Sequence, residues 1–267
     1  MSVTFDFTGK TVFVFGGTSG INLGIAEAFA ARGALVGVAS RSEDKVNAAV
    51  ARLESLGAKA AGYPLDVRNV EAVRDALKAF HAAHGQIDIL ISGAAGNFPA
   101  PALGMSANAF KSVVDIDLLG TFHVMQSAQP YLRVPGASII NISAPQAWIP
   151  MMLQAHVCAA KSGVDMLTRT LAMEWGPMGI RVNSISPGPI DGTEGMKRLA
   201  PTPAAVKATV ESVPLMRMGA VSEIADAAMF LSSPAAAYVS GVVLPVDGGW
   251  SLAGAGTLSM AMVKGQI

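Results

Sequence analysis

The sequence predicts an α/β fold in which one doubly wound parallel sheet carries helices on both faces. Short β-branched runs alternate with longer helical patterns, the runs are apolar along their length, and a glycine-rich turn joins the first run to the first helix. Strands separated by helices indicate parallel βαβ crossovers, and strands that are apolar throughout belong to a sheet covered on both faces. The 267 residues fit a single domain, 1–267, with no internal boundary or repeat.

The predicted strands are short runs rich in β-branched and other apolar residues. In chain order they span residues 11–15, 34–39, 60–65, 87–91, 138–142, 180–185 and 242–246. The predicted helices show apolar residues at helical spacing, as in Val70, Val73, Leu77 and Phe80. They span residues 25–31, 43–56, 70–80, 107–132, 153–175 and 222–231.

Two segments fall outside this alternation. Residues 187–214 are rich in glycine and proline, and we expect residues 188–214 to form a mobile flap over a substrate site. The tail after Ser251 consists of small residues and methionines, which is typical of an arm between subunits or a frayed end.

Composition excludes several classes of protein. Nineteen basic residues balance nineteen acidic ones, which argues against a nucleic-acid partner. One cysteine excludes a disulfide framework, and no His, Cys and Asp cluster has metal-ligand spacing, so we expect no metal. No apolar run reaches the roughly 18 residues of a membrane span, residues 1–10 do not resemble a signal peptide, and residues 264–267 do not match a peroxisomal address. We therefore expect a cytoplasmic protein.

The glycine-rich turn predicts a dinucleotide site. Residues 16–24 read Gly-Gly-Thr-Ser-Gly-Ile-Asn-Leu-Gly between a predicted strand and a predicted helix. Glycines let the backbone approach a pyrophosphate, and the helix N-terminus offers N–H donors and a favourable dipole. The expected contacts come from Gly16, Thr18, Ser19, Gly20 and Ile21.

The end of the second strand favours NADP(H) over NAD(H). An NAD site needs an acidic residue there for the ribose 2′-hydroxyl, but Ser40 and Arg41 follow Ala39 instead. Arg41 suits a 2′-phosphate, although it could also be a solvated arginine. Asp66 and Val67 follow the third strand, where Asp66 either meets the adenine amino group or caps the next helix.

From about residue 5 to residue 250 the chain resembles the short-chain dehydrogenases/reductases. The resemblance rests on the glycine turn and on the segments 65–67, 92–94, 181–183, 187–190 and 247–249. It implies a Rossmann-like fold, a nicotinamide cofactor contacted also by Pro187, Gly188 and Ile190, and assembly as a dimer or tetramer.

Departures from the family pattern concern the catalytic residues. Lys161 matches the family lysine, but Val157 stands four residues earlier in place of tyrosine, Ala144 replaces serine and Asp117 replaces asparagine. Valine cannot transfer a proton, so the usual ketone reduction is not expected. Either the protein is a catalytically silent nucleotide binder, or it uses different acid chemistry. Asn22 replaces the third glycine, and its tolerance of left-handed backbone could preserve binding.

Local matches favour different acid chemistry. Residues 93–98 (Gly-Ala-Ala-Gly-Asn-Phe), 114–117, 172–177 and 189–199, together with His156, resemble 2,4-dienoyl-CoA reductases of the peroxisomal branch, which also lack the tyrosine. The resemblance implies a role in fatty acid metabolism, with NADPH reducing a 2,4-dienoyl-CoA to a 3-enoyl-CoA. The alternatives are a reductase of another conjugated or cyclic carbonyl compound and the silent nucleotide binder.

This reaction needs a hydrogen-bond donor for the enolate oxygen, a proton source for the α-carbon and a nicotinamide bound in a fixed position. We assign Asn97 as the hydrogen-bond donor to the enolate oxygen and Lys161 as the residue that binds the nicotinamide ribose. Asp117 is the natural partner of this lysine. A lone carboxylate is ionised at neutral pH, so we hypothesise that a water held by Asp117 and Lys161 gives the proton.

Further residues are predicted to contact the acyl-CoA substrate. They are Asn97, Phe98, Gln146, Trp148, His156, Lys197 and Arg198. His156 could equally be a hydrogen-bonded buried histidine, and Lys197 and Arg198 could be solvated instead of meeting the CoA phosphates. Assembly as a homotetramer is implied by the resemblance alone.

Overall fold

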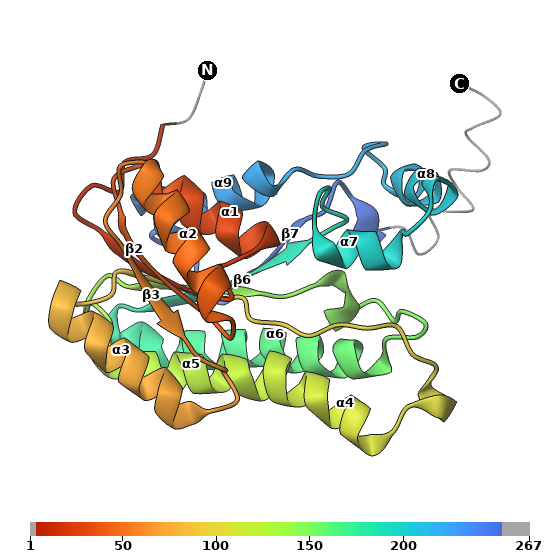
Figure 1. Cartoon of the computed structure of the whole chain (residues 1–267), viewed down its shortest axis with the longest axis horizontal. Coiled ribbons are helices and arrows are strands. Elements are labelled where there is room, and N and C mark those ends of the chain that lie inside the picture. Colours follow the sequence, from red (N-terminus) through yellow and green to blue (C-terminus); the bar gives the residue numbers. More distant parts are fainter. Residues whose placement is uncertain (1–3, 253–267) are drawn as a thin grey trace.

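The computed structural model describes residues 4–252 and confirms the predicted parallel sheet (Figure 1). In this described part seven parallel strands lie in the order β3-β2-β1-β4-β5-β6-β7. The strands are β1 (Thr11–Phe15), β2 (Leu35–Ser40), β3 (Ala60–Pro64), β4 (Ile89–Ser92), β5 (Ser138–Ile142), β6 (Arg181–Pro187) and β7 (Val243–Val246). The chain turns from one half of the sheet to the other between β1 and β4, and ligands of such sheets bind at the strand ends there.

Helices connect the strands, and several begin at residues with good capping side chains. The α-helices are α1 (Gly20–Ala30), α2 (Glu43–Ser55), α3 (Val70–His84), α4 (Ala107–Val113), α5 (Gly120–Ala128), α6 (Ala155–Trp175), α7 (Glu194–Leu199), α8 (Pro203–Ser212) and α9 (Val221–Ser232). Ser42, Asn69 and Ser106 each accept a backbone N–H in the first turn of α2, α3 and α4. These bonds fix where the helices start.

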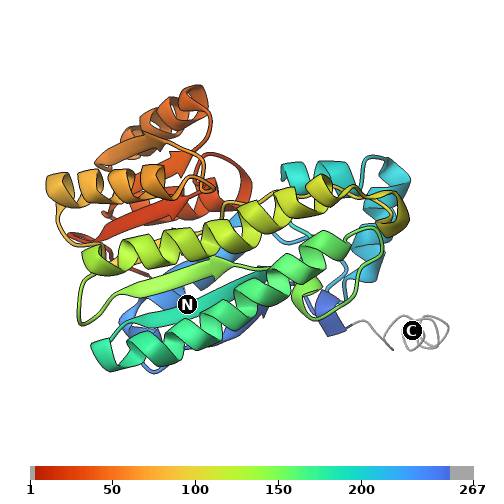
Figure 2. The same ribbon diagram turned by 90° about the horizontal axis from the view of Figure 1, so that it is seen from below.

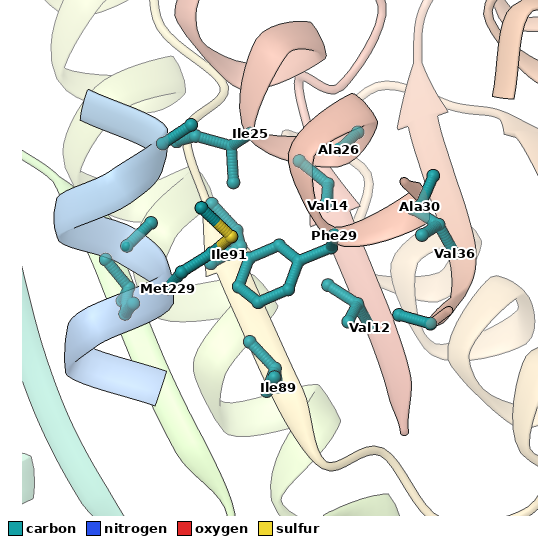
Figure 3. Packing of buried hydrophobic residues seen from close by; sticks show 14 of the residues in the cluster. Val12, Val14, Ile25, Ala26, Phe29, Ala30, Val36, Ile89, Ile91 and Met229 are labelled. Carbon is teal, nitrogen blue, oxygen red and sulfur yellow. The ribbon is translucent and has the colours of Figure 1, made fainter. Parts of the chain in front are cut away.

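The two faces of the sheet bury separate hydrophobic clusters. On β1, Val12 and Val14 point to the layer of α1, α2 and α9, whereas Phe13 and Phe15 point to the layer of α3, α5 and α6. Figure 3 shows the first cluster, in which Phe29 of α1 lies between the β-branched side chains of β1 and β4 and Met229 of α9. Because successive strand residues face opposite sides, one apolar strand can support both layers.

The edge strands differ from the prediction of strands buried on both faces. All residues of β3 and β7 are partly exposed or exposed, whereas the central strands β1 and β4 are completely buried. Each edge strand has a neighbour on only one side, so its outer part meets solvent.

The predicted helix 107–132 is a series of shorter helices. After α4 the chain makes a π-helical turn, η2 (Val114–Leu119), then continues as α5 and ends in a 3₁₀ turn (Gln129–Tyr131). Figure 2 shows this broken helix running alongside α6. A π-turn adds a residue to one helical turn and is common at functional sites.

The predicted flap contains two helices that the sequence analysis did not predict, because glycine and proline are frequent in this segment. Thr193 caps α7, and Thr202 caps α8 with Pro203 at its first position. Both helices lie beyond the carboxyl ends of β6 and β7 (Figure 1). The tail, for which an intersubunit arm or frayed end is expected, lies beyond Leu252 and outside the described residues.

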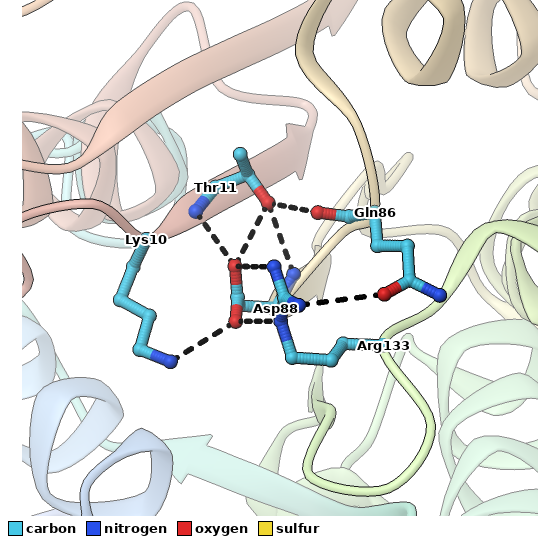
Figure 4. A network of polar contacts seen from close by, with 5 residues as sticks. All are labelled: Lys10, Thr11, Gln86, Asp88 and Arg133. Carbon is cyan, nitrogen blue, oxygen red and sulfur yellow. Dashed lines mark hydrogen bonds and ion pairs between the residues drawn. The ribbon is translucent and has the colours of Figure 1, made fainter.

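A buried acid links β1 to β4 at the amino-terminal ends of these two strands, opposite the end that carries the glycine turn. Asp88 is 4% exposed, and it accepts hydrogen bonds from Lys10 Nζ at 3.1 Å, Arg133 Nε at 2.5 Å and the Thr11 backbone at 3.0 Å (Figure 4). Burial alone would raise the pKa of Asp88, but these donors lower it overall. The network therefore holds an ionised carboxylate.

The structure offers no helix, within residues 4–252, of the length and apolar character required to cross a bilayer. The same residues contain no group of three or more His, Cys, Asp or Glu side chains able to hold a metal ion.

Candidate active site

The glycine turn passes close to the loop after β4. Gly16 has φ +76°, and a Cβ there would lie 2.9 Å from the backbone nitrogen of Ala94, so a side chain is excluded. Gly20 has φ +53°, and a Cβ there would lie 3.9 Å from Thr193 Cγ2, an ordinary van der Waals contact. Ser19 makes no capping hydrogen bond, and the first turn of α1 holds no acidic residue. The N-terminus of α1 thus fits the pyrophosphate of a dinucleotide.

Asn22, at the position of the third glycine, works differently from the expectation. It lies within α1 and outside the left-handed region, so its tolerance of left-handed backbone has no role. Its Nδ2 donates to the Gly93 carbonyl oxygen at 2.7 Å. Asn22 therefore links the glycine turn to the loop after β4, at the point where the sheet reverses its strand order.

A hollow of about 240 Å³ lies beside this turn and contains several predicted cofactor residues. It is lined by Gly16, Ser19, Asn22, Arg41, Leu65, Asp66, Val67, Gly93, Ala94, Ala95 and Ile116. Arg41 is exposed at its rim, just after Ser40 at the end of β2. An exposed guanidinium at this place fits a 2′-phosphate.

Asp66 does not cap the following helix, because Asn69 fills that role by accepting the Ala72 backbone N–H at 3.1 Å. Asp66 instead pairs with Arg68, whose Nη2 lies 2.6 Å from Asp66 Oδ2. The hydrogen bond from Arg68 lowers the pKa of Asp66. The capping alternative is therefore wrong, and Asp66 stays in the lining of the hollow.

A second cavity, of about 410 Å³, begins at Ala95 where the first hollow ends. Four predicted cofactor residues besides Lys161 line it, and they are Ile21, Pro187, Gly188 and Ile190. Its wall from the flap comes from Thr193, Gly195, Met196, Leu199, Thr209 and Ser212. A nicotinamide end and a substrate can meet in this one space.

Lys161 and Asp117 face each other in the wall of this cavity. Lys161 Nζ lies 3.4 Å from Asp117 Oδ2 and donates to the Ile142 carbonyl oxygen at 3.0 Å. Asp117 Oδ1 accepts the Gly96 backbone N–H at 2.6 Å. Both side chains are almost fully buried, and each satisfies the other's charge, as a buried ion requires. This pairing confirms the partner predicted for Lys161.

The π-helical turn places Asp117. The Thr121 hydroxyl, on the first turn of α5, donates to the carbonyl oxygen of Asp117 in the π-turn at 2.7 Å. From there the carboxylate lies between the Gly96 loop after β4 and Lys161 on α6. A regular helical pattern in the sequence carries no sign of this turn.

The rest of the cavity beside Lys161 is aliphatic or neutral. Val157, one helical turn before Lys161, lines the cavity, and so does Ala144 after β5. Asn97 also lines it, and its buried Oδ1 has no hydrogen-bond partner among the described residues. The Gln146 amide donates to Gln154 at 2.8 Å. The amide oxygen of Asn97 thus accepts no hydrogen bond from the described residues.

Five predicted substrate residues do not line the cavity. They are Phe98, Trp148, His156, Lys197 and Arg198. The His156 ring is completely buried against Phe98, with 4.5 Å between ring centroids, and burial lowers its pKa. Neither ring nitrogen has a well-formed hydrogen bond, so His156 is neither a pocket residue nor a satisfied polar one. Trp148 is 43% exposed at the surface.

The two flap cations are exposed and do not line the cavity. Lys197 pairs with Glu194 at 2.8 Å, and Arg198 donates to the Asn97 carbonyl oxygen at 3.5 Å. The contact of Arg198 connects the flap to the loop that carries Asn97. Thr18 lies in the glycine turn but outside both hollows.

Sequence reasoning missed several residues that line the cavity. They are Ser143, Pro145, Thr193, Met196, Leu199, Thr209, Ser212 and Trp250. Trp250 Nε1 donates to Ser212 Oγ at 3.0 Å, which joins the last described turn to α8. The capping residues Thr193 and Thr202 could have indicated the flap helices, but no pattern showed which of their faces turns inward.

A larger hollow of about 530 Å³ lies behind the flap, against α9 and the end of β7. Its charged side chains include Arg217 and Glu223, which bind each other at 2.6 Å, and the hydrogen bond from Arg217 lowers the pKa of Glu223 to about 2. It lacks Lys161, Asp117 and the glycine turn. The chemistry therefore belongs to the cavity that contains these groups.

Comparisons with known proteins agree with this geometry. A family model described as enoyl-(acyl carrier protein) reductase matches residues 16–251. A peroxisomal 2,4-dienoyl-CoA reductase of Rattus norvegicus is 46% identical over 242 residues, 90% of this chain and 83% of that protein. A peroxisomal 2,4-dienoyl-CoA reductase of Saccharomyces cerevisiae is 43% identical over 251 residues, covering 92% of this chain and 86% of that one.

Solved structures give the same result. A short-chain dehydrogenase of Bacillus anthracis has a TM-score of 0.82 and 38% identity, covering 91% of this chain and 96% of that one. A short-chain dehydrogenase/reductase of Mycobacterium ulcerans reaches a TM-score of 0.89 at 34% identity, covering 93% and 92%. Fold and site define an oxidoreductase that uses a nicotinamide nucleotide. The chain belongs to the short-chain dehydrogenase/reductase family.

Proposed function

We propose that this protein reduces 2,4-dienoyl-CoA to 3-enoyl-CoA with NADPH. The observation that carries the proposal is the buried Lys161–Asp117 pair in a cavity whose wall next to the lysine is valine and alanine. Val157 and Ala144 stand where the family pattern has tyrosine and serine. A site with this wall suits reduction of a conjugated thioester better than reduction of a ketone, which needs an acid at the carbonyl oxygen.

The relatives support the same substrate class. The rat and yeast proteins are named as 2,4-dienoyl-CoA reductases that produce (3E)-enoyl-CoA. Because these relatives are 43–46% identical over about nine tenths of this chain, we propose the same acyl thioester for it.

When NADPH is bound, its nicotinamide would supply the hydride for the far end of the conjugated system. Negative charge then develops on the thioester oxygen, and a neutral N–H donor at that point stabilises it. Asn97 lines the cavity, so we assign its Nδ2 amide group, which is a neutral N–H donor, the role of donating to the thioester oxygen. Lys161 is assigned to the nicotinamide ribose.

A proton must also reach the α-carbon. Asp117 already accepts a hydrogen bond from the Gly96 N–H and forms an ion pair with Lys161. We therefore assign it the role of a hydrogen-bond acceptor and not of the acid. We therefore assign the proton to a water molecule held between Asp117 and Lys161. The carboxylate orients this water and the ammonium makes it more acidic.

Arg41 supports NADPH as the form of the cofactor. It is exposed at the rim of the hollow next to the glycine turn, and no acidic residue stands at the end of β2 to hold a ribose 2′-hydroxyl. Arg41 would pair with the 2′-phosphate.

Assembly, pathway and location are further parts of the proposal. Met166 and Met173 are 59% and 81% exposed seven residues apart on α6, and such an apolar stripe suits a homo-oligomer, for which we propose a tetramer. The substrate implies a role in fatty acid metabolism. A cytoplasmic location remains our prediction, although the rat and yeast relatives are named as peroxisomal.

Isotope labelling tests the reaction. With NADPH in deuterated water, the product should be a 3-enoyl-CoA with one solvent deuterium at the α-carbon. With NADPH deuterated at the transferred position in ordinary water, the label should sit at the fifth carbon. Recovery of a 2-enoyl-CoA, or of unchanged dienoyl-CoA with intact NADPH, would contradict the proposed function.

A further inference from the structure

The end of the described chain folds back toward the flap in a tight turn. Asp247, directly after β7, accepts the Gly249 backbone N–H at 2.9 Å and the Ser251 backbone N–H at 2.8 Å through its two carboxylate oxygens. Gly248 and Gly249 have φ +64° and +85°, values in the left-handed region that favours glycine. These bonds and angles fix the position of Trp250 on the turn.

This turn packs between the flap and the cofactor side of the cavity. A Cβ at Gly248 would lie 2.7 Å from Val213 Cγ1, just after α8, and the Leu215 backbone N–H donates to the Gly248 carbonyl oxygen at 3.2 Å. A Cβ at Gly188 would lie 2.6 Å from Asp247 Cα, so the segment after β6 also contacts the turn. Contacts on both sides therefore hold the turn in one place.

Trp250 lies between the cavity and α8. It lines the cavity that contains Lys161, and its Nε1 donates to Ser212 Oγ at 3.0 Å. The Ser212 hydroxyl donates to the Thr209 carbonyl oxygen at 2.7 Å, and the Thr209 hydroxyl donates to the Ala205 carbonyl oxygen at 2.8 Å. Because these polar groups are paired within the protein, the end of the cavity formed by Trp250 and α8 presents mainly apolar surface.

This apolar end lies across the cavity from the buried ion pair. Lys161 donates to Ile142, the last residue of β5, whereas Trp250 follows β7. Because β6 lies between β5 and β7 in the sheet, its end separates the ammonium from the indole. A thioester bound near Asn97 and Lys161 would therefore extend its hydrocarbon chain toward Trp250, where the surface is apolar. The cavity holds about 410 Å³, near the lower limit of ligand pockets at about 300–1,000 Å³, so a long chain soon reaches a wall.

We propose that Trp250 closes the acyl end of the cavity and limits the length of the acyl chain that the enzyme accepts, with Ser212 holding the indole in place. This inference rests on the proposed function and narrows its substrate class. Each methylene group that finds no apolar contact forgoes a factor of about four in affinity, which corresponds to about 0.8 kcal/mol. A few excluded methylene groups thus suffice to discriminate between chain lengths. Ser212 acts through Trp250 and is a positioning residue.

A series of 2,4-dienoyl-CoA substrates of increasing chain length tests this limit. The short substrate is the chain that the wild-type protein uses best, and the long substrate is the first longer chain whose kcat/KM is at least about 10-fold lower. Trp250→Ala should raise the long-to-short ratio of kcat/KM about 10-fold or more, because removal of the ring leaves room for methylene groups. Trp250→Phe and Ser212→Ala should each raise it about 2- to 10-fold, the factor expected for one hydrogen bond.

Ser55→Ala is the matched control for the serine variant. Ser55 Oγ donates to the Arg52 carbonyl oxygen at 2.6 Å at the end of α2, as Ser212 Oγ does to the Thr209 carbonyl oxygen at the end of α8. Because α2 does not line the cavity, this variant should keep the wild-type ratio.

Fluorescence quenching tests the contact without turnover. The probe is a saturated acyl-CoA of the short chain length with bromine on its terminal carbon. It should quench the emission of the wild-type protein more strongly than the same acyl-CoA without bromine, because a heavy atom quenches an indole only at short range. Trp250→Phe should abolish this difference. Trp175→Phe, at the end of α6 and outside the cavity lining, is the control and should keep it.

The outcomes separate this inference from the proposed function. If the wild-type protein reduces dienoyl-CoA but Trp250→Ala keeps the wild-type ratio, or loses activity equally at all chain lengths, the inference alone is wrong. A wild-type protein that accepts every chain length equally well also overturns it. If Trp250→Ala does not fold, an unchanged ratio in Trp250→Phe and Ser212→Ala, or equal quenching by the two acyl-CoA probes, overturns it instead. A bromine effect at Trp250 without reduction of any dienoyl-CoA contradicts the proposed function alone.

Discussion

Lys161 Nζ lies 3.4 Å from Asp117 Oδ2, in a cavity wall where the side chain one turn before the lysine is Val157. The pair is buried, so removing one partner leaves the other as an uncompensated charge. The distance links the π-helical turn to α6 and sets where a proton can be held near the substrate.

Asp117→Asn should lower kcat with dienoyl-CoA at least about 100-fold, since the variant loses the carboxylate that orients the proposed water. NADPH should still bind, because Asp117 is not a proposed cofactor residue. Steady-state assays and NADPH fluorescence titration measure the two effects. Asp115→Asn, on the same turn and paired with Lys111 at the surface, is the control and should keep kcat within about twofold. Full turnover in Asp117→Ala would exclude the proposed proton path.

Arg41→Ala should raise KM for NADPH about 10- to 100-fold and leave KM for NADH nearly unchanged. Loss of a charge-assisted contact of roughly 1.5–3 kcal/mol accounts for this factor. Arg52→Ala, at an exposed arginine of α2 that pairs with Glu27, serves as the control. An equal rise in KM for NADPH and for NADH would mean that Arg41 does not bind the 2′-phosphate.

The fold was predictable because its signals are local and periodic, whereas parts of the site were not. The strand–glycine turn pattern predicts the end of β1 at Phe15, and the helical spacing of Val70 and Phe80 predicts α3. The helix after the glycine turn begins at Gly20, five residues before the expected start at residue 25. The π-turn around Asp117 has no such signal, since it depends on contacts with Gly96 and Lys161, which are distant in sequence.

The flap shows the same limit. Its glycines and prolines indicated a loop, although Pro203 at the first position of α8 is a favourable helix start. His156 was assigned to the pocket because it lies next to Val157, but a one-residue step turns a helical side chain by about 100°, and His156 packs against Phe98 instead.

The flap cations give a prediction about the CoA nucleotide. The double variant Lys197→Ala, Arg198→Ala should raise KM for a dienoyl-CoA several-fold and leave KM for the matching dienoyl-pantetheine thioester unchanged, because the pantetheine lacks the nucleotide phosphates. Lys207→Ala, an exposed lysine on α8, is the control. If KM for both thioesters stays at the wild-type value, these two cations are merely solvated.

Asp88→Asn should destabilise the fold by about 1–3 kcal/mol at pH 7, because the buried carboxylate loses charge-assisted hydrogen bonds while its partners Lys10 and Arg133 remain about half exposed to solvent. The pKa of Asp88 is lowered in the folded state, so its ionised form stabilises the protein above the unfolded value of 3.8. This contribution disappears as the pH falls below 3.8 through the folded pKa. Urea unfolding should therefore show that the difference in free energy of unfolding between the wild-type protein and the variant decreases from pH 7 to pH 3. Asp44→Asn, at an exposed carboxylate on α2, should show no such difference at either pH, and a constant difference for Asp88→Asn would contradict this explanation.

The most direct measurement is NADPH oxidation with a 2,4-dienoyl-CoA, run beside a 3-ketoacyl-CoA of the same chain length. Because Val157 cannot donate a proton to a ketone oxygen, we expect turnover of the dienoyl-CoA and at least about 100-fold lower kcat/KM for the ketoacyl-CoA. Preferred reduction of the ketoacyl-CoA would show that another acid takes the place of tyrosine, and it would contradict the assignment of Asn97, Asp117 and Lys161 to a dienoyl thioester.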